Sequence, residues 1–239
     1  MPGIARVRAQ PPSSARERRD DAVETVMRLP SLVYHLAEAA NWPSIQRDGL
    51  LPAAHLIQRF VGDDAERAAL QRRQRLQHVV LADGVEIRDQ RPLPDAALTS
   101  CLVDLTAAQW YAMLNDRVFF WLDPARVNRH LRACGQRPQV VIALDVVPLV
   151  AAYQARVALS PFNTGNARRR PARRGAATFV PYATWIDTGW ASEAAALGTS
   201  PRARSHAPVE LTVAAAIPDV KRYIVDVTPV PAGGRYAQA

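Results

Sequence analysis

Cysteine is scarce in this chain of 239 residues, which contains only Cys101 and Cys134. Two cysteines this far apart cannot build a disulfide framework, and they lack the spacing of a zinc site. The five histidines also lack metal-ligand spacing. We therefore expect no metal site and a reducing, cytoplasmic location.

Long apolar runs and the common catalytic motifs are also missing. No apolar run reaches the roughly 20 residues of a membrane-spanning helix, so we expect no membrane partner. The sequence lacks glycine-rich phosphate loops, the nucleophile elbow of hydrolases and the kinase motifs. These absences count against dehydrogenases, ATPases and hydrolases.

Lysine is almost absent as well, because Lys221 is the single lysine and arginine supplies the remaining positive charge. The formal net charge is +8. The planar guanidinium group binds phosphate oxygens in pairs, so an excess of arginine suits a nucleic-acid partner. The alternative is a GC-rich genome, which encodes positive charge as arginine.

The chain is expected to form one domain between two tails. Residues 1–28 are basic and rich in proline and serine, which predicts a disordered N-terminal tail rather than a secretion signal. Residues 29–230 carry the apolar segments of a single domain, and residues 231–239 are predicted to be a C-terminal tail. Strands and helices are mixed without a regular βαβ rhythm, which indicates an α+β fold.

Glu210 is the sharpest candidate for catalysis. It lies within residues 209–213, whose composition predicts a strand. Alternation places Leu211 and Val213 on one face, and Glu210 and Thr212 on the other. A carboxylate in such a strand is costly unless it is paired or functional. The alternative is that this second face is solvated, which is common in antiparallel sheets.

His35 is the second candidate. It lies near the end of a strand predicted over residues 31–36, and the alternative is a histidine that only makes a structural hydrogen bond. Asn41 follows as the predicted N-cap of a helix over residues 42–48, with Gly49 as its stop.

Arg88 and Arg91 flank Asp89 and Gln90 in a predicted polar turn. Two arginines three residues apart can clamp a diphosphate. The alternative is an arginine–aspartate pair that holds the loop together.

The densest positive charge lies in a loop predicted over residues 163–176. Aromatic residues follow this loop, and bases of nucleic acid can stack on such rings. The alternative is a solvated loop followed by core aromatics. A second loop is predicted over residues 188–205. Five arginines of the first loop are expected to bind nucleic acid: Arg168, Arg169, Arg170, Arg173 and Arg174.

Three segments form a series along the chain. The first pairs Tyr34 with His35 and continues into residues 41–45, Asn-Trp-Pro-Ser-Ile. The second is the aromatic stretch over residues 118–121, Val-Phe-Phe-Trp, ahead of a proline. The third is the strand that carries Glu210. Together they resemble the DarT-type ADP-ribosyltransferases, which open with a tyrosine–histidine pair and Asn-Leu-Pro-Ser-Ile and carry a late catalytic glutamate.

The resemblance covers roughly residues 31–228 and implies an ADP-ribosyltransferase-like split β-sheet core with surrounding helices. NAD, as co-substrate, would bind in a cleft between the two halves of the sheet. The implied activity is mono-ADP-ribosyl transfer to a base of nucleic acid, with single-stranded DNA favoured over RNA. Residues 161–205 match no target-recognition loop of the family. An antitoxin partner is implied by analogy alone.

The resemblance also implies the roles of individual residues. Glu210 would stabilise the oxocarbenium-like ribose and could act as base for the acceptor. Arg88 or Arg91 would neutralise the diphosphate, and Arg88 is assigned to catalysis beside Glu210. His35 would hold the adenosine-side ribose, and an aromatic ring would stack on nicotinamide. The expected cofactor-binding residues are Tyr34, His35, Asn41, Arg91, Phe119 and Phe120.

Two other functions stay open from the sequence. A nucleic-acid-binding module without catalysis would explain the charge and needs nothing from His35 or Glu210. An ADP-ribosyltransferase that acts on protein would use the arginine loop for solubility only. The related RNA 2′-phosphotransferases also use NAD but lack the late glutamate, so Glu210 argues against them.

Overall fold

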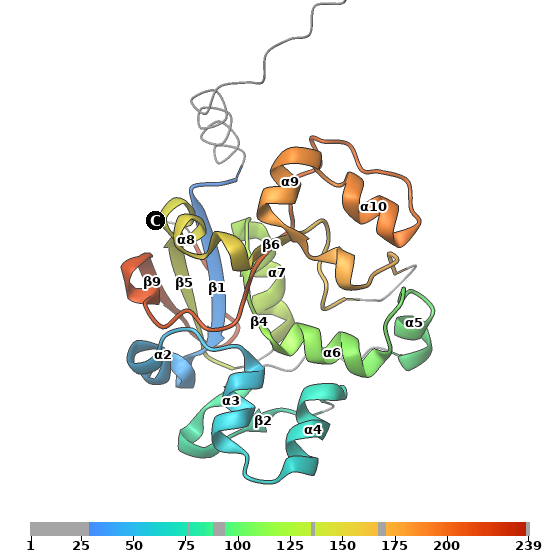
Figure 1. Ribbon diagram of the computed structural model, residues 1–239. Helices are drawn as coiled ribbons and strands as arrows, with labels where there is room; N and C mark the ends of the chain where they lie inside the picture. Colours follow the sequence, from blue (N-terminus) through green and yellow to red (C-terminus); the bar gives the residue numbers. More distant parts are fainter. Residues whose placement is uncertain (1–28, 76, 88–93, 135–136, 167–170, 238–239) are drawn as a thin grey trace, which may run out of the picture.

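An antiparallel sheet of seven strands forms the centre of the computed structural model, which describes residues 29–75, 77–87, 94–134, 137–166 and 171–237 (Figure 1). The strand order is β7-β6-β8-β4-β1-β5-β9. A small second sheet pairs β2 with β3. The strands are β1 (Leu32–Glu38), β2 (Val79–Val80), β3 (Glu86–Ile87), β4 (Arg117–Trp121), β5 (Gln139–Asp145), β6 (Val157–Ser160), β7 (Val180–Pro181), β8 (Glu210–Ala214) and β9 (Ile224–Val230).

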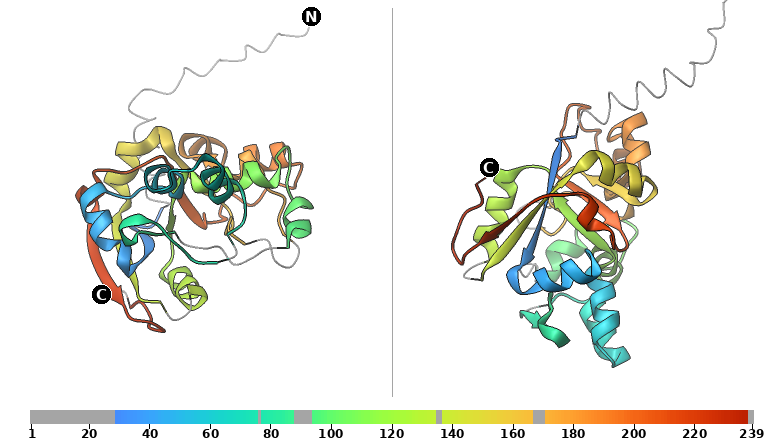
Figure 2. Two further views of the ribbon diagram at one scale, coloured as in Figure 1. Left: turned by 90° about the horizontal axis from the view of Figure 1, so that it is seen from below. Right: turned by 90° about the vertical axis from the view of Figure 1, so that its left-hand side faces the viewer.

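Helices cover both faces of the large sheet. In the left view of Figure 2, α8 and α7 lie on opposite sides of the strands. The mixture of an antiparallel sheet with helices confirms the predicted α+β class. The helices are α2 (Trp42–Asp48), α3 (Ala53–Phe60), α4 (Asp64–Arg72), α5 (Asp95–Thr99), α6 (Ala107–Asn115), α7 (Pro124–Cys134), α8 (Val146–Tyr153), α9 (Tyr182–Thr188) and α10 (Ala191–Leu197).

The large sheet is divided between β1 and β4. On its other side β1 pairs with β5 along its whole length, from Leu32↔Asp145 to Glu38↔Gln139. With β4 it pairs only at Tyr34↔Trp121. One half of the sheet is therefore β9-β5-β1 and the other is β4-β8-β6-β7, and a single residue pair joins them.

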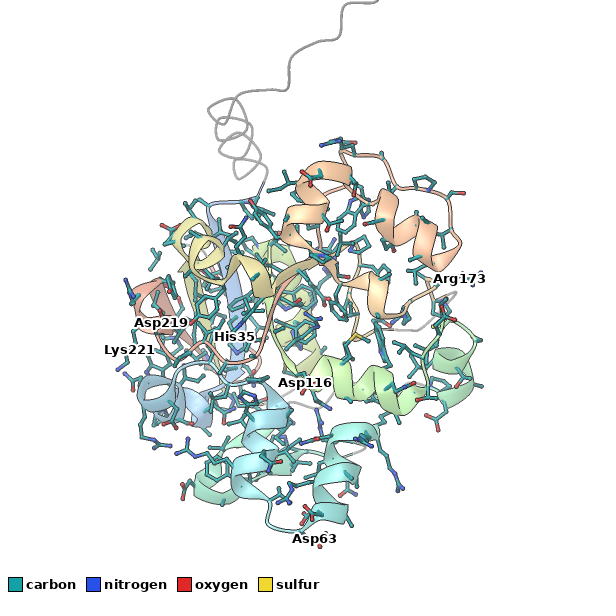
Figure 3. All side chains as sticks on the ribbon, in the orientation of Figure 1. His35, Asp63, Asp116, Arg173, Asp219 and Lys221 are labelled. Carbon is teal, nitrogen blue, oxygen red and sulfur yellow. The ribbon has the colours of Figure 1, made fainter. Side chains whose placement is uncertain are left out.

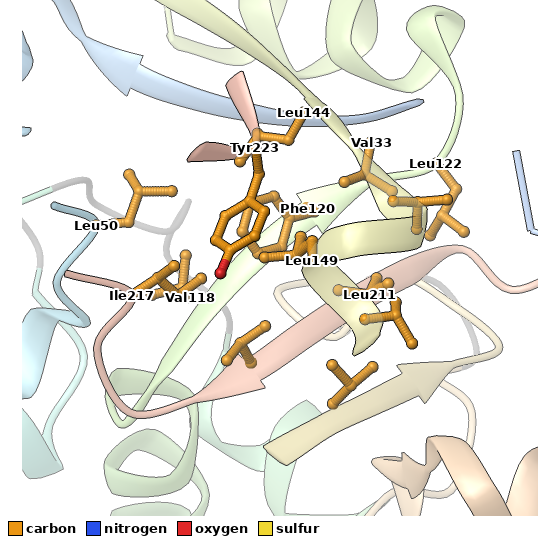
Figure 4. Packing of buried hydrophobic residues seen from close by; sticks show 14 of the residues in the cluster. Val33, Leu50, Val118, Phe120, Leu122, Leu144, Leu149, Leu211, Ile217 and Tyr223 are labelled. Carbon is orange, nitrogen blue, oxygen red and sulfur yellow. The ribbon is translucent and has the colours of Figure 1, made fainter. Parts of the chain in front are cut away.

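One face of the sheet, here called the core face, carries the main hydrophobic core (Figure 4). Val33, Phe120 and Leu211 point into it from β1, β4 and β8. Helices α2, α8 and α9 cover this face with apolar side chains that include Leu149 of α8. Burying one such leucine stabilises the fold by about 1.5–3 kcal/mol.

The opposite face, here called the α7 face, carries Tyr34, Phe119 and Glu210 in alternation with the core residues. Helix α7 covers β1 and β5 there through Val127 and Leu131. Helices α5 and α6 cover the other half of the sheet in a separate apolar cluster, which Phe119 adjoins. Glu210 stands on the same face as these two clusters.

Helix α7 begins where the sequence predicts. The Asp123 carboxylate accepts a hydrogen bond from the backbone N–H of Ala125 at 2.8 Å, and Pro124 takes the first helical position. This start aligns Arg126 and His130, four residues apart, on one side of the helix.

Two predicted boundaries are wrong. Residues 231–237 are not a free tail, because Tyr236 is buried against Tyr34 and exchanges two backbone hydrogen bonds with the Asn128 amide, each of 2.9 Å. The predicted loop over residues 188–205 contains α10. The predicted N-terminal tail lies outside the described residues. Within the described ranges, no helix has the length and apolarity needed to cross a membrane.

Candidate active site

Glu210 is the first residue of β8 and is only 4% exposed. Its neighbours across the sheet are Trp121 on β4 and Ser160 on β6. The predicted alternation is confirmed, because Leu211 packs in the core. The alternative of a solvated second face is wrong, because Thr212 on that face is 0% exposed. Glu210 is therefore a buried carboxyl group that needs partners.

Thr164 supplies those partners from the loop that follows β6. Its backbone N–H donates to Oε2 of Glu210 at 3.1 Å, and its hydroxyl donates to the same oxygen at 2.8 Å. Within the described part of the chain, both hydrogen bonds to this carboxyl group end on Oε2. Two donors on one oxygen fix the orientation of the group.

Burial raises the pKa of Glu210 to about 7. Desolvation is the main cause, since it penalises the ionised form. The hydrogen bonds from Thr164 and the positive charges of Arg126 and Arg174 lower the pKa and so oppose this effect. A carboxyl group that exchanges its proton near neutral pH is suited to general-base catalysis. Its ionised form can stabilise a developing cation.

Arg174 is buried beneath this loop and is 1% exposed. Its guanidinium donates to the backbone carbonyls of Thr164 at 3.1 Å, Asn166 at 3.0 Å and Ala172 at 3.2 Å. Burial lowers the pKa of Arg174. The prediction that Arg174 binds nucleic acid is wrong, because its donors already hold the loop that positions Thr164 against Glu210.

The other arginines of the predicted cluster have a different status. Arg173 is exposed and lies beside Gly198 at the end of α10, on the right of Figure 3. Its contact with nucleic acid stays a prediction. Arg168, Arg169 and Arg170 lie outside the described residues.

The His35 ring lies at the division of the sheet. Its Nδ1 is 2.9 Å from the carbonyl oxygen of Phe119, and Nδ1 is the donor because a carbonyl only accepts. His35 pairs with Ile142 of β5 and has its ring centre 5.8 Å from that of Phe120, on the core face. The sequence brings His35 and Glu210 to one cofactor, but the structure places them on opposite faces of the sheet.

Unlike His35, Tyr34 lies on the α7 face together with Glu210. The cross-strand pairs Tyr34↔Trp121 and Trp121↔Glu210 put the three residues in one row. Tyr34 is buried under the C-terminal segment, with its ring centre 5.7 Å from that of Tyr236, and burial raises its pKa. Tyr34 thus packs α7 and the C-terminal segment onto the sheet.

Asn41 is the N-cap residue of α2, as the sequence predicts. Its side chain makes no capping hydrogen bond to α2. Instead the Asn41 amide donates to the carbonyl of Glu86 and accepts from the N–H of Glu86, both at 2.7 Å. This pairing resembles one rung of a β-ladder and holds β3 beside the start of α2. The predicted N-cap position is confirmed although its side chain bonds elsewhere, and a contact with cofactor stays a prediction.

Phe119 and Phe120, the two predicted stacking residues, point to opposite faces of β4. Phe120 is 1% exposed in the core, so the prediction that it contacts a cofactor is wrong. Phe119 is half-buried on the α7 face, with its ring centre 6.2 Å from that of Phe179. Phe119 therefore shares a face of the sheet with Glu210, and its contact with a cofactor stays a prediction.

Three residues on this face were missed from the sequence. The Trp121 indole N–H donates to Nδ1 of His130 at 3.0 Å, and the two rings meet edge to face. Arg126, one turn earlier on α7, acts electrostatically on Glu210. The available signal was the Asp123-Pro124 helix start, which puts Arg126 and His130 on one side of the helix directly after the aromatic strand.

Arg88 and Arg91 lie outside the described residues, in the segment that joins β3 to α5. Their predicted roles are therefore not tested. In the described ranges, no group of three or more His, Cys, Asp or Glu side chains could hold a metal ion.

The comparisons with known proteins identify a family without assigning a function. The sequence model of a family of unknown function (DUF7002) matches residues 31–224. Because this match covers most of the chain, the chain belongs to that family. A search of the curated proteins found no match.

Proposed function

We propose that this DUF7002 protein is an NAD-dependent mono-ADP-ribosyltransferase that modifies a base of single-stranded nucleic acid, with DNA favoured. Its catalytic carboxylate is Glu210. One observation carries the proposal. The buried carboxyl group of Glu210 stands on a strand of a divided sheet, accepts two hydrogen bonds from Thr164, and has a pKa of about 7. Such a group can both stabilise positive charge and accept a proton near neutral pH.

The division of the sheet supports NAD as the ligand. The resemblance to DarT-type enzymes implies a cofactor cleft between two halves of a split sheet. Here β1 and β4 are joined by one residue pair, and the Phe119 carbonyl turns to the His35 ring rather than to a ladder N–H of β1. His35 enters the proposal as a positioning residue, which fixes the Phe119 backbone at the edge of the division.

The proposed reaction breaks the bond between C1′ of the nicotinamide ribose and the nicotinamide nitrogen. The bonding electron pair leaves with nicotinamide, which becomes neutral, and C1′ becomes oxocarbenium-like. Ionised Glu210 stabilises that positive charge. A nitrogen of the acceptor base then forms the new bond to C1′ and loses its proton, which Glu210 takes up.

Neighbouring side chains have supporting roles in this proposal. Phe119 stacks on nicotinamide, because it is half-buried on the same face as Glu210. Arg126 favours the ionised form of Glu210. Arg88 and Arg91 keep their proposed contact with the diphosphate, with Arg88 assigned to catalysis.

The acceptor is argued from charge alone. The net charge of +8 favours a polyanion, and Arg173 is exposed near the loop that holds Thr164. Arg174 does not contribute, because it is buried. This leaves a protein acceptor as a possible outcome of the experiment rather than as a second proposal.

The test incubates the protein with NAD labelled in its adenylate part and with separate pools of single-stranded DNA, RNA and bulk protein. Glu210→Gln is measured in parallel, and Glu66→Gln on the exposed surface of α4 serves as the matched control. We expect label on the DNA pool from the wild type and from Glu66→Gln, with at least a hundredfold loss in Glu210→Gln.

The other outcomes change the proposal in defined ways. Label on protein alone would replace the nucleic-acid acceptor and keep the transferase. Oligonucleotide binding at low salt without any consumption of NAD would replace the enzyme with a binding module. Activity retained in Glu210→Gln would remove Glu210 from catalysis.

A further inference from the structure

Arg117, the first residue of β4, carries a positive charge that the described protein does not neutralise. Its Nε atom is buried and has no hydrogen-bond partner among the described residues. Among these residues its guanidinium makes a single hydrogen bond, a long one of 3.4 Å from Nη1 to the hydroxyl oxygen of Thr212. Burial lowers the pKa of Arg117, and Asp116, the exposed preceding residue, only partly offsets this effect.

Arg117 as a whole is half-buried, but a buried donor atom of a charged group is normally hydrogen-bonded. The guanidinium lies over the Phe179 ring, 4.3 Å from its centre. A cation–π contact of this kind is attractive, but it supplies no counter-charge and no acceptor for the N–H donors. Arg174 is the instructive contrast, since carbonyl oxygens accept from each of its three guanidinium nitrogens.

Arg117 stands on the same face of the sheet as Glu210. The pairs Phe119↔Thr212 and Trp121↔Glu210 show that Arg117 and Phe119 alternate onto the α7 face together with these partners. Thr212, which Arg117 contacts, is two residues from Glu210, a separation of about 7 Å along the strand. The Arg117 guanidinium therefore lies on the same face as Glu210 and contacts a residue two positions along β8 from it.

We infer that Arg117, whose guanidinium the Thr212 hydroxyl positions, forms a subsite for phosphate oxygens of the ligand on which Glu210 acts. The Thr212 hydroxyl donates to the carbonyl of Ala158 at 3.2 Å, which turns its oxygen lone pairs toward Arg117. The planar fork of a guanidinium matches two phosphate oxygens. That the ligand is a dinucleotide diphosphate rests on the proposed function; that it is a phosphate anion does not.

The test measures binding by calorimetry with two probes, NAD and inorganic pyrophosphate. Arg117→Met keeps the length of the side chain on Phe179 and removes its charge. Arg222→Met is the control, because the Arg222 side chain is 77% exposed and lies just before β9. We expect Arg117→Met to lower the affinity for both probes at least tenfold. Arg222→Met should leave both affinities within twofold of the wild type.

The outcomes separate this inference from the proposed function. Pyrophosphate binding that depends on Arg117, without consumption of NAD, keeps the anion subsite and removes the transferase. Consumption of NAD with unchanged binding in Arg117→Met keeps the transferase and overturns the subsite. Absence of binding of either probe to the wild type also overturns the subsite.

The melting temperature distinguishes an anion-binding role of Arg117 from a structural role, because the two roles predict opposite changes in Arg117→Met. If Arg117 serves to bind an anion, Arg117→Met removes an uncompensated charge from the unliganded protein. The melting temperature then stays equal to that of the wild type or rises. A melting temperature lowered by several degrees would assign Arg117 to structure instead.

Discussion

Thr164 donates two hydrogen bonds to one oxygen of Glu210, at 3.1 Å from its backbone N–H and at 2.8 Å from its hydroxyl. The residue lies on a loop that Arg174 ties down through backbone carbonyls. The orientation of the candidate catalytic carboxyl group thus depends on a loop 46 residues away in sequence, and on a buried cation beneath it.

Thr164→Val tests the hydroxyl hydrogen bond. Valine has nearly the same shape but no donor, so the pKa of Glu210 is expected to rise above its present value of about 7. A hydrogen bond to a charged group contributes about 1.5–3 kcal/mol, which predicts a loss of activity of about tenfold or more at pH 7. The pH–activity profile should shift to higher pH. The exposed Thr188→Val is the control, and an unshifted profile would contradict the role of Thr164.

Glu210→Gln tests the effect of pH on stability. The pKa of Glu210 is about 7 in the folded state, against an ordinary value of 4.5. Between these values the folded state holds a proton that the unfolded state has released, so stability falls as the pH rises through this interval. The loss amounts to about 3 kcal/mol. Urea denaturation should find Glu210→Gln more stable than the wild type at pH 8, with the difference disappearing near pH 4.5. If the free energies of unfolding of the two proteins depend on pH in the same way, the raised pKa of Glu210 is ruled out.

The pair Arg173→Ala and Arg174→Ala tests the correction to the arginine cluster. Arg174→Ala leaves three backbone carbonyls without their charged donor and should destabilise the protein by about 3 kcal/mol or more. Arg173→Ala at the exposed neighbour should change stability by less than about 0.5 kcal/mol. Thermal denaturation measures both. Equal effects of the two substitutions would refute the structural assignment of Arg174.

Asn41→Ala tests the connection between α2 and β3. Removing the amide breaks two hydrogen bonds of 2.7 Å with the backbone of Glu86 and should cost about 1–3 kcal/mol. Amide hydrogen exchange at Glu86 should become much faster than in the wild type. The exposed Gln58→Ala on α3 serves as control. Unchanged protection at Glu86 would show that β3 is held without Asn41.

Local patterns in the sequence were sufficient for the features that depend on neighbouring residues. The alternation over residues 209–213 correctly separated Glu210 from Leu211, because side chains of a strand point to opposite faces with a period of two. The Asp123-Pro124 pair correctly predicted the start of α7, because a cap and a first-turn proline act within one helical turn.

Only the tertiary structure decided which chemically similar residues differ in role. Arg173 and Arg174 are adjacent and identical in type, yet one is exposed and the other is buried among carbonyl oxygens. Asn41 has the predicted N-cap position, but the partner of its side chain is the backbone of Glu86, 45 residues along the chain. The single residue pair between β1 and β4 depends on the packing of strands that lie far apart in the sequence. These outcomes depend on long-range packing, which composition and local periodicity do not encode.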